Sequence, residues 1–317
     1  QGYSSAASDV YKRQVLYISH RMGELQQISD RITVMRDGQC VGTVRTADAS
    51  LEEIIRMMVG RVIYEQPKER SAVPAGAPTV LEVRGLRSRD VHDVSFTLHK
   101  GEILGLAGLM GAGRTETARL LCGADRRDGG EIRVNGRTVD IRTPSDAVRA
   151  GIGYLSEDRK RFGLCLHLSV ADNIALPSLE RFTRAWMVND RKVRKMAHAY
   201  RKRIDIRTPS VDSPVRRLSG GNQQKVVLAK WLARDCDILI FDEPTRGIDV
   251  GAKSEIYRLM NQLAAEGKSI VMISSEMPEL LRMSDRILVM CEGVKTGELD
   301  IGEATQEKIM ALAAPRG

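Results

Sequence analysis

The sequence predicts an α/β protein whose core is a mainly parallel β-sheet. Three observations support this fold class: short apolar segments that suit buried strands, the glycine-rich stretch GLMGAGRT directly after one of them, and the stretch ILIFDEP, in which another ends in an Asp-Glu pair. Parallel strands are covered on both faces and therefore appear as short, nearly continuous apolar runs. The chain is long enough for one full domain of about 240 residues with a good core.

The apolar runs define the expected strands. Residues 103–107, 152–155, 238–242, 270–274 and 287–290 are expected to form the core sheet. Residues 80–83 and 94–98 are expected to pair in a small antiparallel sheet, because Val94, Phe96 and Leu98 alternate on one face. Between Phe162 and Arg217 the periodicity becomes helical, which predicts a helical subdomain.

Residues 108–115 have the spacing of a phosphate-binding loop, with arginine at the position of the usual lysine. Glycines let the backbone turn so that its amides face phosphates, and a helix expected over residues 114–122, stopped by Gly123, adds its positive end. Thr115 would give a hydroxyl to Mg²⁺, whereas a guanidinium is planar and wider than an ammonium, so fast hydrolysis is not expected here. The candidate nucleotide-binding residues of this loop are Gly108, Gly111, Ala112, Gly113, Arg114, Thr115 and Glu116.

Two further motifs follow in order along the chain, LSGGNQQK at residues 218–225 and the Asp-Glu strand at residues 238–244. Ser219 and the amides of the two glycines after it are expected to start a helix whose positive end faces the γ-phosphate of a nucleotide held by another domain. Of the two carboxylates, Asp242 and Glu243, one would hold the Mg²⁺ shell and the other would orient or deprotonate an attacking water.

One sequence pattern occurs twice, as YISHRMGELQQISDRITVMRDGQCVGTV at residues 17–44 and as MISSEMPELLRMSDRILVMCEGVKTGEL at residues 272–299. Ile18 matches Ile273, so the offset is 273 minus 18, which is 255 residues or about one domain of this kind. The two segments are therefore expected to be the same tail of two tandem domains, and the chain to be the carboxyl-terminal part of a longer protein.

The expected domain organisation follows from this repeat. Residues 1–14 match nothing in the second copy and are expected to be a non-native tail. Residues 15–64 are interpreted as the end of a first domain, residues 65–78 as a proline-punctuated linker, and residues 79–317 as a complete second domain.

Composition is ordinary for a packed α/β chain, with 42% hydrophobic and 28% charged residues. No apolar run approaches the roughly 18 residues that a membrane span needs, so membrane association would require a partner. The five cysteines show no C-x-x-C pair, which indicates neither a zinc site nor a disulfide framework. The net charge of +8 is concentrated in residues 191–203, where apolar residues recur at helical spacing, so a solvated basic helix is favoured over a nucleic-acid site.

The segments GLMGAGRTE, YLSEDRKRFGL, LSGGNQQKVVLAKWL and IFDEPTRGIDVGAKSEIY resemble the second ATPase domain of the ATP-binding subunits of bacterial monosaccharide ABC importers, of the ribose/galactose/xylose type. The resemblance covers residues 79–313, and residues 15–64 resemble the end of the first domain. It implies an ABC-type P-loop ATPase fold, with a mainly parallel core sheet, a small antiparallel β subdomain and a helical subdomain.

The resemblance also implies roles for individual residues. Glu157 stands at the glutamine of the Q-loop, Ser275 at the switch histidine, and His20 at the switch histidine of the first copy. The remaining positions are Ser219, Gly220, Gly221 and Asn222 at the signature, Asp242 at the Mg²⁺ carboxylate, Glu243 at the catalytic base, and Asp249 at the D-loop.

Arg114, Glu157 and Ser275 depart from the pattern of a competent ATPase, which implies that two sites of a head-to-tail pair differ. The signature of this domain, with His20, would complete the competent site on the first domain, and the site built on Arg114 would be slow. The implied cofactors are ATP and Mg²⁺, and the implied partners are a transmembrane sugar permease and, indirectly, a periplasmic sugar-binding protein. The implied location is the cytoplasmic face of the bacterial inner membrane.

Two other classes of function stay open at this point. A soluble ABC ATPase of DNA repair or translation would carry long coiled-coil or basic arm insertions, and none interrupts residues 113–219 beyond a helical subdomain. A non-catalytic nucleotide-dependent interaction module is favoured by Arg114 and Ser275 but opposed by the intact Asp242 and Glu243.

Overall fold

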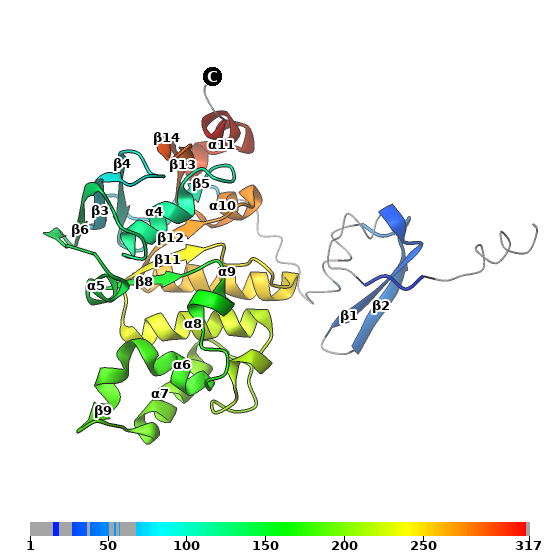
Figure 1. The fold of residues 1–317 in the computed structure, drawn as a ribbon. Helices are drawn as coiled ribbons and strands as arrows, with labels where there is room; N and C mark the ends of the chain where they lie inside the picture. The colour runs from blue at the N-terminus through cyan, green and yellow to red at the C-terminus, as the bar shows by residue number, and fades with distance from the viewer. Residues whose placement is uncertain are drawn as a thin grey trace, which may run out of the picture. The chain divides into compact units, whose positions relative to one another are not determined.

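The structure is a computed structural model that describes residues 15–18, 27–36, 39–50, 54, 57 and 68–314. The chain forms two compact units. One contains residues 1–64 together with 249–251, and the other contains residues 65–248 and 252–317. Figure 1 shows the elements of each unit, which are described separately below.

The smaller unit contains the antiparallel strands β1 (Arg31–Arg36) and β2 (Gln39–Arg45). One face of this hairpin is buried, through Ile32 and Val34, which pack with Ala49 and Ile54. Alternation of buried and exposed residues is what a strand with one covered face requires.

The core of the larger unit is a six-stranded sheet with the order β14-β13-β5-β12-β11-β8. Its strands are β5 (Ile103–Ala107), β8 (Ile152–Leu155), β11 (Ile238–Asp242), β12 (Ser269–Ile273), β13 (Arg286–Cys291) and β14 (Val294–Asp300). All pairings are parallel except that of the edge strand β14 with β13. The predicted mainly parallel sheet is therefore confirmed, although β12 lies one residue earlier than expected and β13 is one residue longer at each end.

The hairpin β13–β14 has the same register as β1–β2 at the offset of 255 residues. Both strands of each hairpin have matching bounds, and both ladders have a register shift at the matching position, between Val34 and Met35 and between Val289 and Met290. The buried residues match too, because Ile287, Val289 and Ile309 form a cluster where the first copy has Ile32, Val34 and Ile54.

A second, antiparallel sheet of the larger unit has the order β4-β3-β6-β7. It contains β3 (Thr79–Arg87), β4 (Val94–His99), β6 (Gly129–Val134) and β7 (Arg137–Thr138). The predicted β3–β4 pair is confirmed, and the β6–β7 hairpin was not predicted. Its turn is Asn135-Gly136, with φ of 49° and 75°, which is a common two-residue hairpin turn.

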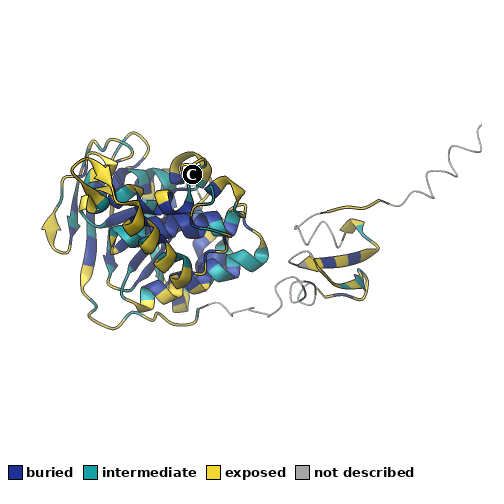
Figure 2. Ribbon diagram, turned by 90° about the horizontal axis from the view of Figure 1, so that it is seen from below, coloured by how far each residue is buried: buried dark blue, intermediate teal, exposed yellow. Residues whose placement is uncertain are grey.

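Helices cover both faces of the core sheet, as Figures 1 and 2 show. The helices are α4 (Arg114–Leu121), α5 (Pro144–Arg149), α6 (Val170–Ala175), α7 (Asp190–Arg203), α8 (Gly220–Arg234), α9 (Val250–Ala265), α10 (Met277–Met283) and α11 (Gln306–Ala313). Leu239 and Phe241 of β11 face the cluster formed with α8 and α9, whereas Ile238 and Ile240 face the cluster formed with α4 and the antiparallel sheet. Two buried faces explain the continuous apolar runs in the sequence.

The helical subdomain predicted between residues 162 and 217 is present and ends at the start of α8. It contains α6 and α7 together with shorter elements, namely the π-helical turn η1 (Arg159–Gly163), the 3₁₀ turns η2 (Leu176–Phe182) and η3 (Val215–Arg217), and the two-residue strands β9 (Thr183–Arg184) and β10 (Met187–Val188). A further 3₁₀ turn, η4 (Ile301–Glu303), precedes α11. No helix among the described residues is long and apolar enough to cross a membrane.

The N-termini of the helices differ in how they are capped. Side chains of Thr143, Ser169, Asn189 and Thr305 accept from first-turn amides of α5, α6, α7 and α11. At α4 and α8 no side chain caps the first turn in the described part of the chain, although a serine stands at the N-cap of α8. Helix starts leave backbone donors without intrahelical acceptors, so these two ends present amides to whatever lies in front of them.

The segment predicted as a linker, residues 65–78, is described from Lys68 onward. Several of its residues contact one buried carboxylate, that of Asp285. Asp285 accepts the amide of Ala72 at 2.8 Å and the hydroxyl of Ser71 at 3.1 Å, and it pairs with Lys68 at 2.6 Å. On its other oxygen it accepts the amide of Ile103 at 2.9 Å. One aspartate therefore joins this segment to the start of β5.

Candidate nucleotide-binding site

The phosphate loop lies between β5 and α4, and its glycines adopt backbone angles that other residues avoid. Gly108, Gly111 and Gly113 have φ of 154°, 79° and 92°. A Cβ at Gly108 would lie 2.5 Å from the carbonyl oxygen of Met290, so a larger residue there would displace backbone. At Gly111 a Cβ would meet nothing within 4 Å, which leaves the loop open on that side.

The loop is held from behind by the turn between β13 and β14. The amide of Gly293 donates to the carbonyl of Ala112 at 3.1 Å, and the amide of Ala112 donates to the carbonyl of Leu109 at 3.1 Å. The Cβ position of Gly113 lies 3.0 Å from the Cα of Gly293. This backing leaves the first amides of α4 pointing forward, where phosphates would be bound.

Asp242 lies at the end of β11 and is completely buried. Its Oδ1 accepts the hydroxyl of Thr115 at 3.1 Å, and its Oδ2 accepts the hydroxyl of Tyr154 at 2.8 Å. Burial raises the pKa of this carboxyl, although the two hydroxyl donors and Arg114 oppose the shift. The structure thus brings the predicted threonine and aspartate together in the first turn of α4 and the end of β11.

Glu243 follows directly and has a left-handed backbone, with φ of 49°. Such a conformation costs a non-glycine residue of the order of 1 kcal/mol and is often found at functional sites. The amide of Glu243 donates to the carbonyl of Ile273 at 2.9 Å, and its Oε2 accepts the hydroxyl of Ser275 at 3.2 Å. Burial raises its pKa, with Arg114 and Ser275 opposing the shift.

Arg114 turns its guanidinium toward the switch segment after β12. Its Nη1 donates to the carbonyl oxygen of Ser274 at 2.7 Å. Burial lowers the pKa of Arg114, while the nearby Glu243, Asp242 and Glu116 oppose that shift. Glu116, the remaining predicted loop residue, lies in the first turn of α4.

The donor set fits Mg²⁺ and a polyphosphate. A threonine hydroxyl and a buried carboxylate whose pKa burial has raised are oxygen ligands in a place where a cation would be favourable. The positive-φ glycines form a loop that is open in front of α4, and the helix start carries uncapped amides.

The signature residues lie apart from this loop, at the start of α8. Ser219 is its N-cap, and its hydroxyl oxygen accepts from Nδ2 of Asn222 at 2.9 Å instead of capping an amide. A Cβ at Gly221 would lie 2.6 Å from the Cβ of Ala252, so this glycine permits close packing with α9. Oδ1 of Asn222 accepts the amide of Arg207 at 2.7 Å.

The segment that contains Glu157 reaches toward the signature instead of the phosphate loop. Glu157 forms an ion pair with Arg246, which follows the Asp-Glu strand. Nη1 of Arg159 donates to the carbonyl of Arg246 at 3.1 Å, and its Nε donates to Oε1 of Gln223 at 3.4 Å. A Cβ at Gly220 would lie 2.7 Å from the guanidinium of Arg159, so the first glycine of the signature makes room for this side chain.

Two further predicted site residues are Asp249 and His20. Asp249 is exposed and directly precedes α9. His20 lies outside the described residues.

Two groups that organise the site were missed in the sequence reasoning. Tyr154 is 88 residues from Asp242 in the chain, and only the β8–β11 pairing brings them together. Glu279 is buried and accepts the hydroxyl of Thr245 at 2.5 Å, the hydroxyl of Tyr257 at 2.7 Å and that of Ser274. Its recurrence as Glu24 in the repeated pattern was the available signal.

Comparison with known proteins identifies the class. A family model described as ABC transporter matches residues 91–246. A nucleotide-free ATP-binding cassette from an ABC transporter has the same fold, with a TM-score of 0.63, 18% identity and coverage of 75% of this chain and 96% of that one. The larger unit is therefore an ABC-type ATPase domain, and its residues 91–246 belong to the ABC transporter family.

Relatives with higher sequence identity have names that specify a transported substrate. A putative ribose/galactose/methyl galactoside import ATP-binding protein from Burkholderia cenocepacia is 64% identical over 304 residues, and a ribose import ATP-binding protein from Rubrobacter xylanophilus is 52% identical over 301. The alignments cover 95% and 94% of this chain but 59% and 60% of those proteins. The chain is thus a homologue of sugar-import ATP-binding proteins and spans about three fifths of their length.

Proposed function

We propose that this chain is part of an ATP-binding and ATP-hydrolysing subunit that energises import of a monosaccharide through a membrane permease. The names of the relatives support the substrate class, and the phosphate loop with the Thr115 and Asp242 oxygens supports Mg-ATP as the nucleotide. When bound, Mg²⁺ would neutralise charge that develops on the phosphates. Glu243 would accept a proton from an attacking water.

The chain would carry parts of two tandem ATPase domains, the end of one at residues 15–64 and the second at residues 79–317. Support comes from the repeated pattern and from the two hairpins with the same register and the same bulge. The second domain would pair head to tail with the first.

The site on the second domain would turn over slowly. The observation that carries this step is the bond from Arg114 to the carbonyl of Ser274, because it occupies a donor of the loop's cationic side chain that a bound phosphate would otherwise use. Ser275 donates to Glu243 where a histidine would reach the γ-phosphate, and Glu157 is paired with Arg246.

The same domain would donate a working signature to the competent site. No side chain among the described residues caps the start of α8, and the Ser219 hydroxyl accepts from Asn222 beside the first amides of the helix. Such a helix end stabilises a phosphate that another domain presents. The switch residue His20 would serve that competent site.

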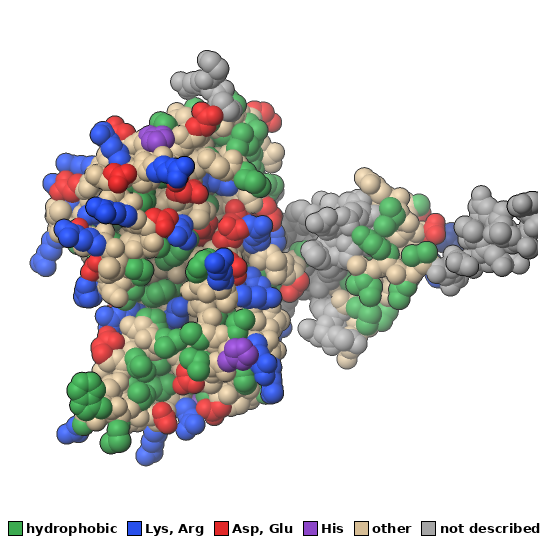
Figure 3. Space-filling view, in the orientation of Figure 1, with side chains coloured by type: hydrophobic (Ala, Val, Ile, Leu, Met, Phe, Trp, Pro, Cys, Tyr) green, Lys and Arg blue, Asp and Glu red, His purple; other side chains and the backbone are tan. Residues whose placement is uncertain are grey.

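The proposed partners are a transmembrane sugar permease and, through it, a sugar-binding protein of the periplasm. The subunit would be peripheral, on the cytoplasmic face of the membrane, and no nucleic acid is expected as a partner. Figure 3 shows acidic side chains interspersed with the basic ones on the visible face of the larger unit, in keeping with this expectation.

The division of labour is tested by two substitutions in the full-length tandem protein assembled with its permease. Ser219→Arg places a long side chain in front of α8 and is expected to lower steady-state ATP hydrolysis by about a hundredfold, as loss of a preorganised phosphate-facing site does. Glu243→Gln is expected to lower it less than about twofold, since it acts at the slow site. Equal losses in the two variants would show that both sites share the turnover.

A further inference from the structure

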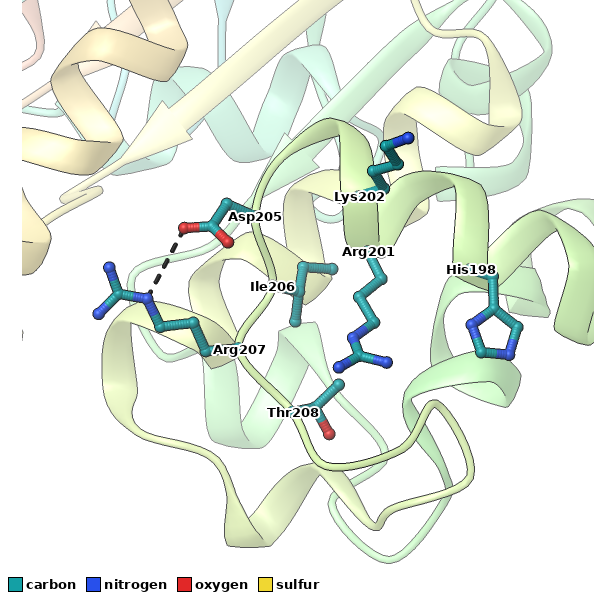
Figure 4. Close-up of a pocket in the computed structure, with 7 residues that line it drawn as sticks. All are labelled: His198, Arg201, Lys202, Asp205, Ile206, Arg207 and Thr208. Atoms are coloured by element: carbon teal, nitrogen blue, oxygen red, sulfur yellow. Dashed lines mark ion pairs between the residues drawn. The ribbon is translucent and has the colours of Figure 1, made fainter.

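A hollow of about 610 Å³ lies at the C-terminal end of α7, on the helical subdomain and away from the phosphate loop. Figure 4 shows its lining, in which Arg201 points from α7 toward Thr208, His198 lies beside it, and Lys202 extends in the opposite direction from Arg201. The lining residues are His198, Arg201, Lys202, Asp205, Ile206, Arg207 and Thr208. Its volume is within the range of small-molecule sites.

The charge in this hollow is positive and largely unmatched. Arg201 is half-buried, yet its side chain has neither an ion-pair partner nor a hydrogen-bond acceptor in the part of the chain that the structure describes. A guanidinium carries five N–H donors, and removing them from water without an acceptor is unfavourable. An anion in the hollow would supply the missing acceptors.

The acidic group of the hollow does not meet this need. Asp205 lies 3.7 Å from the guanidinium of Arg207 and 4.0 Å from the ammonium of Lys225. Arg207 is also paired with Glu255 at 3.0 Å, outside the hollow. Two other arginines of α7 do have acidic partners, Arg194 with Asp212 at 2.8 Å and Arg203 with Glu266 at 2.6 Å.

The hollow is connected to the signature by two hydrogen bonds. The backbone amide of Arg207, in the lining, donates to Asn222 at 2.7 Å, and Asn222 donates to the hydroxyl of Ser219 at 2.9 Å. An anion that orders residues 205–208 would therefore also fix the side chain that holds Ser219.

We propose that this hollow is a regulatory site for a small phosphate-bearing molecule, which Arg201 binds with His198, while the neighbouring Lys202 adds positive charge. Arginine is the usual partner of phosphate because its planar fork matches two phosphate oxygens. The bound anion stabilises the start of α8 through Arg207 and Asn222. The second half of this proposal rests on the proposed role of the signature, whereas the binding site itself does not.

The binding test uses inorganic pyrophosphate at constant ionic strength, with acylation of lysine amines followed by mass spectrometry. Because this readout is local to Lys202, it distinguishes pyrophosphate binding in the hollow from binding at the phosphate loop. Pyrophosphate is expected to slow acylation of Lys202 severalfold and to leave the exposed Lys160 unchanged. Arg201→Gln is expected to raise the half-saturating concentration by about tenfold, as the loss of a charge-assisted pair does. The matched control Arg194→Gln removes a paired arginine of the same helix and is expected to leave it unchanged.

Absence of protection, or equal protection in the Arg201→Gln chain, would overturn the site. Vesicles of phosphatidylglycerol test the other source of phosphate. Sedimentation of the chain with vesicles that depends on Arg201, without protection by pyrophosphate, would show that the hollow binds a lipid headgroup and not a free molecule.

The connection to the signature is tested by hydrogen exchange on the same chain, with no nucleotide present. Pyrophosphate is expected to slow exchange at Arg207 and in the first turn of α8 in the wild type. In the Asn222→Ala variant, pyrophosphate should still slow hydrogen exchange at residues 205–208 but no longer in the first turn of α8. An unchanged first turn of α8 in the wild type would remove the regulatory half of the proposal while leaving the ATPase assignment untouched.

Discussion

Asp242 and Asp285 are both buried at ends of core strands, yet they are satisfied in different ways. Asp285 accepts two backbone amides and a serine hydroxyl and pairs with Lys68. Asp242 accepts only the hydroxyls of Thr115 and Tyr154 among the described residues. Backbone amide donors and a cation stabilise the ionised form of a carboxylate. A buried carboxylate that accepts only from neutral hydroxyls has a less stable ionised form.

This difference separates a structural acid, Asp285, from the proposed Mg²⁺ ligand, Asp242. Asp285 has its full set of partners within the chain and holds the segment before β3 against β5. Asp242 lies beside the open phosphate loop with a pKa that burial has raised, so a cation from outside would complete its environment. A carboxylate without a cationic pair beside a phosphate loop is a better indicator of a metal site than burial alone.

The largest expected effect comes from Asp285→Ala. It leaves the amides of Ile103 and Ala72 and the Lys68 ammonium without their acceptor, and the free energy of unfolding should fall by about 3 to 5 kcal/mol. Urea unfolding followed by tryptophan fluorescence measures it, since both tryptophans, Trp186 and Trp231, lie in the larger unit. A loss below about 1 kcal/mol would mean that water replaces the carboxylate at little cost.

Asp242→Asn should act in the opposite direction. The amide keeps hydrogen-bonding groups toward Thr115 and Tyr154 but carries no charge, so the free energy of unfolding at neutral pH should rise by about 1 kcal/mol. Stabilisation of the chain by ATP should meanwhile lose its dependence on Mg²⁺. Thermal unfolding with ATP, with and without Mg²⁺, checks both statements, and a destabilised variant would contradict the assignment of Asp242 as the functional acid.

The neighbouring site carboxylates Asp242 and Glu243 should make the stability of the chain depend on pH. Because the pKa values of Asp242 and Glu243 are raised in the folded chain, it binds protons that the unfolded chain releases. Their contribution to stability is therefore present below the ordinary carboxyl pKa of about 4 and is lost as pH rises through the raised values. In the double variant Asp242→Asn, Glu243→Gln this part of the decline should vanish, as urea unfolding across the acid range would reveal.

Lys68→Met should have the smallest effect. Asp285 retains its backbone and serine donors, and Lys68 is partly exposed, so the expected loss is about 1 kcal/mol or less. A loss as large as that of Asp285→Ala would show that the ion pair, not the amide bonds, holds the segment. The same urea experiment decides between them.

Sequence reasoning predicted the core strands well because each is covered on both faces. The bounds of β5, β8 and β11 match the apolar runs in the sequence. In a parallel sheet both faces of each strand are buried, so a continuous apolar run coincides with a strand. The β6–β7 hairpin was missed although Asn135-Gly136 marks its turn. The helix of the phosphate loop ends at Leu121 because Cys122 already has a non-helical backbone before Gly123 at φ 64°.

The candidate site could be predicted as a set of motifs but not as a set of contacts. Thr115 and Asp242 were expected at one Mg²⁺ site, and they do lie together. The direction of the Arg114 side chain and the partner of Glu157 depend on residues far away in the chain, Ser274 and Arg246. Side-chain pairings of this kind follow from the strand order, which one sequence does not specify.

The bond from Gly293 to the carbonyl of Ala112 has a consequence for the entropy of nucleotide binding. A glycine-rich loop has many conformations in an unfolded chain, and restricting it is unfavourable. Because the turn between β13 and β14 already restrains this loop, most of that conformational entropy is lost when the domain folds and not when the nucleotide arrives. Loosening the turn would therefore weaken binding without touching any group that contacts the nucleotide.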